Sequence, residues 1–198
     1  MAAFSTTTTT LQAIASVVAS GVGMSSELNI STCLGGNLSI RFGRRSATAA
    51  GAGVNFRCDY SPETTGDDSW VSYLLSVSAF AACEAEAVSG TVGSGTNVIT
   101  VASTTNLVAG DIIFIDNGTI GNSEWGRVKS IVANTSVTIE DNLTNAQTGA
   151  TLYDAAEIYA PALILPGYKR LRVVADGSLF TQAFAWQAKA TLITGIGA

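Results

Sequence analysis

The feature of this sequence that most restricts its fold is an alternation of apolar and polar side chains with a period of two. Leu38, Ile40 and Phe42 alternate with polar residues, and residues 54–60 (VNFRCDY) repeat the pattern. Successive side chains of a β-strand point to opposite faces, whereas an α-helix repeats about every 3.6 residues. The alternation therefore predicts strands that each bury one face, and hence an all-β fold.

The same signature continues toward the C-terminus. A strand is expected from Trp70 onward, where apolar side chains recur at every second position through Val77. Residues 169–175 (KRLRVVA) and 180–191 are predicted to form a hairpin. The Asp-Gly pair at 176–177 lies between them, and glycine tolerates the positive φ that a tight hairpin turn requires.

The middle of the chain differs from both flanks, because its apolar runs are shorter and its turn residues are denser. Short strands packed this closely predict a small barrel of SH3-like type, which we place at residues 91–154. The flanking segments, 26–90 and 155–198, resemble each other more than they resemble the middle. We therefore expect one β-sandwich that the barrel interrupts, since loop tips tolerate the insertion of a domain. The short strands are expected at residues 97–101, 111–115, 125–132 and 136–140.

The composition favours a protein that other subunits cover. Charged residues make up only 13% of the chain, and interface cores are depleted in charge. The net charge of −5 opposes binding to nucleic acid, which needs cations to displace counterions from phosphates. Histidine is absent, so the usual general base near neutral pH is missing. We assign no catalytic residue and expect no enzyme activity and no cofactor.

The three cysteines indicate neither a metal site nor a disulfide framework. Cys33, Cys58 and Cys83 are an odd number, and no two of them form a CxxC pair. Cys58 falls on the apolar face of the alternation at residues 54–60. It is therefore predicted to be a buried free thiol, as is usual for a protein assembled in cytoplasm.

Residues 1–25 carry no charge and are expected to form an N-terminal arm with a threonine tract. No basic residue precedes Arg41, so the apolar run that follows the tract does not match a signal peptide. That run is also too short to span a membrane. We expect the arm to be mobile in the free protein and to become a short helix or an added strand when a neighbour covers it. The candidate assembly residues, at roughly helical spacing, are Leu11, Ile14, Val17 and Val18.

Acidic and aromatic residues admit functional interpretations, but structural ones are favoured. An acidic group near one loop offers oxygen ligands for Ca²⁺, although aspartates there also suit turns. The second acidic group is scattered over the turns of the middle segment. Three tryptophans could stack on a sugar, although packing in a core or an interface is favoured for each. The residues concerned are Asp59, Glu63, Asp67 and Asp68; Asp111, Asp116, Glu124, Glu140 and Asp141; and Trp70, Trp125 and Trp186.

Two stretches of the sequence, covering about half of it, resemble virion structural proteins of tailed bacteriophages. Residues 96–152 contain ITVAS, GDIIFIDNGT, EWGRV and VTIEDNLTNA in that order. Residues 38–70 contain LSIRFGRRSATA, VNFRCDY and GDDSW. The resemblance carries no catalytic residue with it.

The resemblance implies a structural subunit of the virion, assembled in the host cytoplasm. The expected role is a capsid decoration or auxiliary protein that binds the head lattice and stabilises it. Its expected partners are other copies of itself and virion proteins such as the major capsid protein, with neither nucleic acid nor membrane among them. The alternatives are a neck or tail subunit, a module that binds host glycan, and a secreted adhesin or surface-layer fragment.

Overall fold

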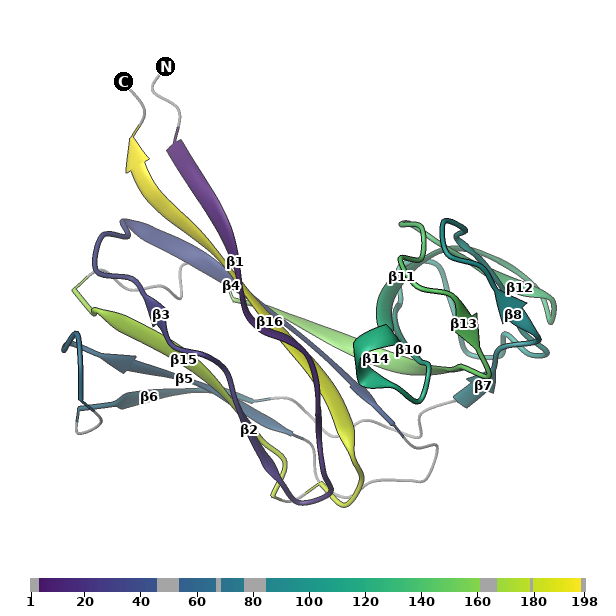
Figure 1. The fold of residues 1–198 in the computed structure, drawn as a ribbon, viewed down its shortest axis with the longest axis horizontal. Coiled ribbons are helices and arrows are strands. Elements are labelled where there is room, and N and C mark those ends of the chain that lie inside the picture. Colours follow the sequence, from purple (N-terminus) through teal and green to yellow (C-terminus); the bar gives the residue numbers. More distant parts are fainter. Residues whose placement is uncertain are drawn as a thin grey trace.

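The computed structural model describes residues 4–45, 54–66, 69–76, 85–160, 167–178 and 180–196. This part of the chain is built from strands β1 to β16 and one 3₁₀ turn, η1 (Ile120–Asn122), with no α-helix among them (Figure 1). The all-β prediction is therefore confirmed. The strands form a curled sheet of nine strands, a second sheet of five and a small sheet of two.

The nine-stranded sheet extends over most of the molecule, and its neighbouring strands are antiparallel. The strand β7 (Ala85–Ala87) pairs beside the main path of this sheet. The order along the path is β1 (Phe4–Val17), β16 (Phe184–Ile196), β4 (Gly35–Arg44), β14 (Thr151–Ala160), β10 (Ile112–Asp116), β11 (Glu124–Val132), β12 (Ser136–Ile139) and β9 (Val98–Thr100).

The two smaller sheets complete the architecture. In the five-stranded sheet, β15 is the central strand. It pairs with β5 on one side and with the short strands β2 and β3 on the other. The two-stranded sheet lies in the middle of the sequence. The five-stranded sheet contains β2 (Val22–Met24), β3 (Leu28–Asn29), β15 (Arg170–Asp176), β5 (Asn55–Ser61) and β6 (Val71–Ser76), and the small sheet contains β8 (Thr91–Val92) and β13 (Gln147–Thr148).

The first hydrophobic core lies between the five-stranded sheet and the β1–β16–β4 part of the large sheet. The aromatic rings of Phe42 and Phe56 meet across it with centroids 5.2 Å apart, and Phe56 also lies 6.0 Å from Trp186. The faces predicted from the alternation are the buried ones. These are Leu38, Ile40 and Phe42 on β4 and Phe56, Cys58 and Tyr60 on β5, next to Val54.

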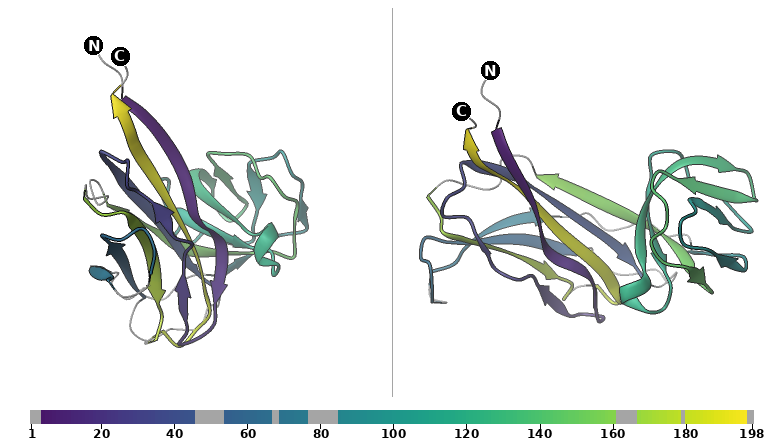
Figure 2. Two further views of the ribbon diagram at one scale, coloured as in Figure 1. Left: turned by 60° about the vertical axis from the view of Figure 1, so that its left-hand side comes forward. Right: turned by 45° about the horizontal axis from the view of Figure 1, so that its top comes forward.

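The second hydrophobic core belongs to the middle of the sequence, between Val88 and Leu152. It includes Ile113 and Ile115 of β10 and shares no residue with the first core. Figures 1 and 2 show the strands around it gathered at one end of the molecule, away from the layered sheets.

Strand β14 joins the two cores because it takes part in both. Its first half pairs with β10 and β7, and its second half pairs with β4. Ala155 marks the change, since it lies opposite Ile112 on one side and Gly43 on the other. Strand β14 is therefore hydrogen-bonded to strands of both cores, and it connects the two cores directly.

The predicted arm at residues 1–25 is wrong for the part that the structure describes, because that part carries β1 and β2. Strand β1 pairs with β16 from Phe4 opposite Ile196 to Val17 opposite Phe184. The spacing that suggested a helix has a physical cause in β-bulges. Between Thr10 and Ala15, β1 advances by five positions while β16 advances by three, which breaks the period of two.

The predicted hairpin at the C-terminus is also wrong, although both strands exist. Strand β15 pairs with β5, β2 and β3, whereas β16 pairs with β1 and β4 in the other sheet. The Asp-Gly segment crosses between sheets, and Gly177 donates its N–H to the Gly21 carbonyl. Both strands bury an apolar face in the first core. Because the strands lie in opposite sheets, the two apolar faces pack against each other across that core.

Candidate functional site

The structure does not bring the four predicted assembly residues together on one free surface. Leu11 and Val17 are buried in the first core, so their apolar contacts come from this chain itself. Ile14 is half-buried and lines a cleft described below. Val18 is 72% exposed, in the turn between β1 and β2. Of the four, Ile14 and Val18 are the two that remain accessible to a neighbour.

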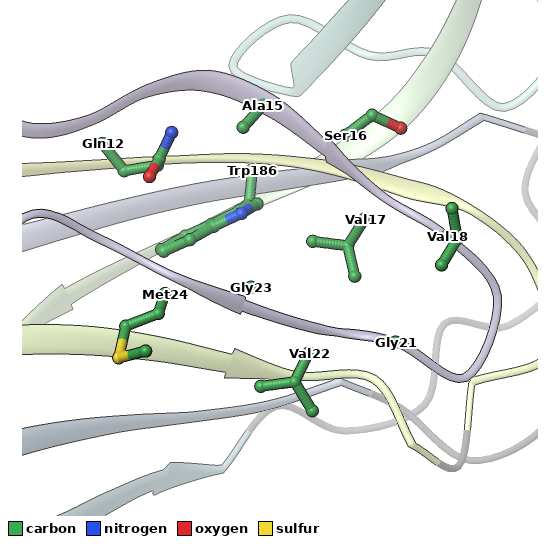
Figure 3. A pocket seen from close by; sticks show the side chains of 10 residues that line it. All are labelled: Gln12, Ala15, Ser16, Val17, Val18, Gly21, Val22, Gly23, Met24 and Trp186. Carbon is green, nitrogen blue, oxygen red and sulfur yellow. The ribbon is translucent and has the colours of Figure 1, made fainter.

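A pocket of about 280 Å³ opens beside this turn, where the edge strands β1 and β2 face each other (Figure 3). We call it the edge pocket. Val17 and Val18 approach it from the β1 side, Val22 and Met24 from the β2 side, and Trp186 lies between them (Figure 3). Val18, Val22 and Met24 are each more than half exposed, so large apolar side chains meet solvent here.

The outer side of β1 is a sheet edge, and the Leu11 carbonyl of this strand accepts the backbone N–H of Ser26 at 3.2 Å. This strand stands at the end of the nine-stranded order, so no other strand of the described chain pairs with its outer side. Its 14 residues, FSTTTTTLQAIASV, include no charged side chain. Thr6, Thr7, Thr8 and Thr10 are exposed along it. The edge pocket lies against the same strand, so the sheet edge and the exposed apolar side chains are continuous.

A second concavity of about 350 Å³ lies where the two cores meet, and we call it the junction cleft. One wall is the outer face of the large sheet, with Arg41 of β4 and Gln187 and Lys189 of β16. The opposite wall comes from η1 and the residue after it, from β11 and from the segment before β13. The residues of that wall are Gly121, Ser123, Glu124, Trp125, Thr144 and Asn145.

Two carboxylates fix the junction by pairing with arginines. Glu157 of β14 accepts hydrogen bonds from Arg41 of β4 at 3.0 Å and from Arg127 of β11 at 2.9 Å, so it links both walls. Asp116 at the end of β10 binds Arg45 through two nitrogens, at 2.8 and 3.0 Å. Such bidentate pairs fix geometry as well as contributing energy. The junction is therefore a defined contact between the two cores.

The pKa values of both carboxyl groups reflect this pairing. Burial alone would raise the pKa of Glu157, but hydrogen bonds from Ser39 and Arg41 and the charges of both arginines lower it below its ordinary value. Burial acts in the same direction on Asp116, and Arg45 together with the Gly118 N–H brings the net pKa shift downward. Both groups are therefore held in their charged form.

The floor of the junction is closely packed. The rings of Trp125 and Phe114 are 4.6 Å apart, and both lie against Gly43. A Cβ atom at position 43 would lie 2.8 Å from the Phe114 Cβ and 3.2 Å from the Trp125 Cζ3. Nearby, the Glu124 carboxylate accepts the backbone N–H groups of Thr144 and Asn145 at 2.9 and 2.7 Å, which fixes that wall of the cleft.

The three tryptophans occupy different environments and do not form one platform. Trp186 is buried in the first core, as the packing interpretation predicts. Trp70 stacks with the guanidinium groups of Arg170 and Arg172, at 4.7 and 4.1 Å from its ring. Trp125 is half-buried and lines the junction cleft. A sugar-stacking role is thus geometrically open for Trp125.

The first acidic group is divided between an ion pair and exposed loop residues. Asp59 is buried and accepts hydrogen bonds from Arg57 and Arg172, both at 3.1 Å, and from Ser72 at 2.7 Å. Glu63 is exposed, and residues 67 and 68 lie outside the described part. Among the residues that the structure describes, no group of three or more histidine, cysteine or acidic residues could hold a metal ion.

The second acidic group is mostly structural. Asp111 accepts the backbone N–H of Val108 at 2.7 Å, which closes a turn. Asp116 pairs with Arg45, and Glu124 accepts backbone N–H groups in the wall of the junction cleft. Glu140 lies 3.9 Å from Arg127, at the rim of the same junction. These carboxylates do not form a metal-binding group in the described part of the chain, and Asp141 is exposed in a bend.

The prediction for Cys58 is confirmed, because its thiol is free and fully buried. Burial raises the pKa of this thiol to about 12. Cys33 is also free and half-buried, and burial raises its pKa as well. Cys83 lies outside the described residues.

Comparison of the sequence with protein-family models finds no match, and comparison with curated proteins finds none either. The described part of the chain contains no helix that is long and apolar enough to cross a membrane. The edge pocket involves the predicted Val17 and Val18, whereas sequence reasoning missed the junction cleft.

Proposed function

We propose that this chain is a structural subunit of a tailed-phage particle, without catalytic activity. The proposed role is a capsid decoration or auxiliary protein that binds the head lattice and stabilises it. The observation that carries the proposal is the run Thr6–Thr10 of β1, an uncharged stretch between the β-bulges of this strand whose outer side no strand of the described chain pairs with. Natural proteins usually protect such edges with charges, bulges or covering elements, because they template pairing with another chain. A neighbouring subunit is the covering element proposed here.

The edge pocket supports the same proposal. Its exposed side chains Val18, Val22 and Met24 extend the β1 edge into an apolar surface, of the kind that subunit contacts cover. The low fraction of charged residues, 13%, agrees with large covered surfaces. The proposed partners are a second copy of the chain and other virion proteins such as the major capsid protein, in the virion after assembly in the host cytoplasm.

The proposed domain organisation is a β-sandwich at residues 26–90 and 155–198, interrupted by a small SH3-like barrel at residues 91–154. Two hydrophobic cores with no residue in common support this division. Residues 1–25 belong with the sandwich in this scheme, since Leu11 and Val17 are part of its core.

The experiment is to purify particles of the encoding phage on a density gradient and to search them for this protein by mass spectrometry and antibody labelling. Label on the head in negative-stain images supports a decoration protein. Label at the neck or tail supports the alternative location of the same structural role. A protein absent from purified particles would overturn the proposal.

A charged substitution on the β1 edge tests whether this edge attaches the protein to the particle. Thr7→Lys places on the exposed edge the residue that natural edges use against pairing, and we expect lower occupancy on particles. Thr64→Lys, at an exposed loop position, is the matched control and is expected to keep wild-type occupancy. Equal occupancy for both variants would show that the β1 edge is not the attachment surface.

A further inference from the structure

The junction cleft combines a polar lining with a fixed shape. Its volume of about 350 Å³ is near the lower end of the range of about 300–1,000 Å³ that is usual for small-ligand sites. Its walls come from two separately packed cores, a common position for ligand sites. Figure 2 shows the two strand groups that meet here, joined by β14.

Three side chains of the cleft have hydrogen-bonding groups to spare. The amides of Gln187 and Asn145 and the ammonium of Lys189 make no side-chain hydrogen bond or ion pair with any described residue, yet all three line the cleft. Gln187 and Lys189 are two positions apart on β16, so they project from the same face. Amides offer a donor and an acceptor side by side, which suits the neighbouring hydroxyl groups of a sugar ring.

Trp125 adds an aromatic surface. It is covered on part of its surface by Phe114 and Gly43, and it also lines the cleft. Its indole Nε1 is buried and has no hydrogen-bond partner, an unusual state for a buried tryptophan. An aromatic ring next to amide groups provides both an apolar contact for the C–H face of a sugar and donors for its oxygens.

The remaining charged groups of the cleft are already engaged. Glu157 pairs with Arg41, and the Glu124 carboxylate is occupied by the backbone N–H groups of Thr144 and Asn145. These contacts hold the walls in place before any ligand arrives, which lowers the entropic cost of binding. Lys189 is then the cation left available, and it favours a ligand that carries a negative charge.

From this arrangement we infer that the junction cleft binds an acidic saccharide. Trp125 contacts a ring face, Gln187 and Asn145 bind hydroxyl groups, and Lys189 pairs with the carboxylate of a uronic acid. This inference goes beyond the proposed structural role, and Ile14 is the residue of β1 that lines the cleft. The volume of about 350 Å³ suits a short stretch of sugar units.

The test uses the purified full-length chain and oligomers of galacturonic acid, with oligomers of galactose as the neutral comparison. Binding is followed by calorimetry and by the indole N–H signals of the tryptophans in two-dimensional NMR. We expect the acidic oligomers to bind more tightly and to shift the Trp125 signal. We expect Lys189→Ala to weaken that binding roughly tenfold, the effect of losing one charge-assisted hydrogen bond.

Matched variants separate the site from the fold. Lys129→Ala removes an exposed lysine of β11 that does not line the cleft, and it should leave binding unchanged. Gln187→Ala and Trp125→Phe should weaken binding, and Trp125→Phe keeps an aromatic ring against Phe114 in case a smaller residue fails to fold. Lack of binding by the wild-type protein, or equal binding by the Lys189→Ala variant, would overturn the inference. Neither result would affect whether the protein is found on particles.

Discussion

At the scale of single residues, Gly43 shows how closely the two cores approach each other. It belongs to a strand of the first core, yet its nearest contacts are Phe114 of β10 and Trp125 of β11, two strands that carry residues of the second core. The backbone of Gly43 is not left-handed, so its conformation does not require glycine. Glycine is required because a side chain has no room here. A methyl group at this point would push the two cores apart.

We therefore expect Gly43→Ala to reduce the free energy of unfolding by about 1–3 kcal/mol, as overpacked sites usually do. Urea denaturation followed by tryptophan fluorescence measures the change. Gly93→Ala is the control, since a Cβ atom there meets nothing within 4 Å. Equal free energies of unfolding for the two variants would show that the junction accommodates the added methyl group without losing stability.

Cys58 provides a second prediction at this scale. Burial raises the pKa of its thiol to about 12, so almost none of it is thiolate at pH 8, and only the thiolate reacts. We expect a thiol reagent to modify Cys58 only after denaturation, whereas the half-buried Cys33 reacts earlier. Mass spectrometry of peptides from protein labelled for increasing times assigns each site. Rapid modification of Cys58 in the native protein would contradict its position in the core.

At the scale of elements, the strands show what the sequence can and cannot predict. The faces of β4 and β5 were predictable because each strand keeps one unbroken alternation, with Leu38 and Phe56 on its buried side. Strand β1 was not predictable as a strand, since its bulges break the alternation between Thr10 and Ala15. The partner of β15 was also beyond the sequence, because an Asp-Gly turn signal does not tell a hairpin from a crossing between sheets.

The position of β1 changes what its removal should do. Deleting residues 1–10 removes the pairing of Phe4–Thr10 with β16 but no residue of the first core, so we expect only a modest loss of stability. Deleting residues 1–25 also removes Leu11 and Val17 from the first core, where losing one large apolar side chain typically costs about 2–5 kcal/mol. Thermal unfolding of the two truncated proteins compares them directly. A fully stable protein lacking residues 1–25 would restore the interpretation of this segment as a free arm.

The junction between β10, β14 and β4 should be sensitive to acid. The folded-state pKa values of Asp116 and Glu157 lie below their ordinary values of 3.8 and 4.5. Their contribution to stability is therefore present above about pH 5 and is lost as the pH falls through the lowered values. We expect Glu157→Gln to flatten the dependence of unfolding free energy on pH between about 6 and 3.

Urea denaturation at a series of pH values provides the measurement for this variant. The exposed Glu63→Gln variant is the control for removing a charge, and it should keep the stability of the wild type at pH 7. A pH dependence in Glu157→Gln as steep as that of the wild type would show that this ion pair does not stabilise the folded state.

At the scale of the whole molecule, the two cores and the shared strand predict partial independence. Excising residues 92–154 and joining the ends with a short Gly/Ser linker should leave the first core folded, because β14 keeps its pairing with β4 from Ala155 onward. Calorimetry should show one cooperative transition at a lower temperature, since Arg45 loses Asp116. Absence of a cooperative transition would mean that the chain has a single folding unit.

The candidate sites were less predictable than the fold. Val17 and Val18 were selected from the sequence, and both line the edge pocket, but the assumption that a neighbour must cover Val17 was wrong. No short stretch of the sequence indicates the junction cleft. Gln187 and Trp125 are far apart in the sequence, and their proximity depends on β14 joining the two parts of the large sheet.

The pairing of Phe4 with Ile196 has a mechanical consequence. The two ends of the described chain leave the molecule side by side on the β1–β16 ribbon (Figure 1). Because the hydrogen bonds of antiparallel strands run perpendicular to the strands, a force that separates these ends would break the bonds one after another. The ribbon would peel open at low force, whereas a pull along β4 and β14 would have to shear several bonds at once. The same molecule is therefore compliant at its ends and stiff between its cores.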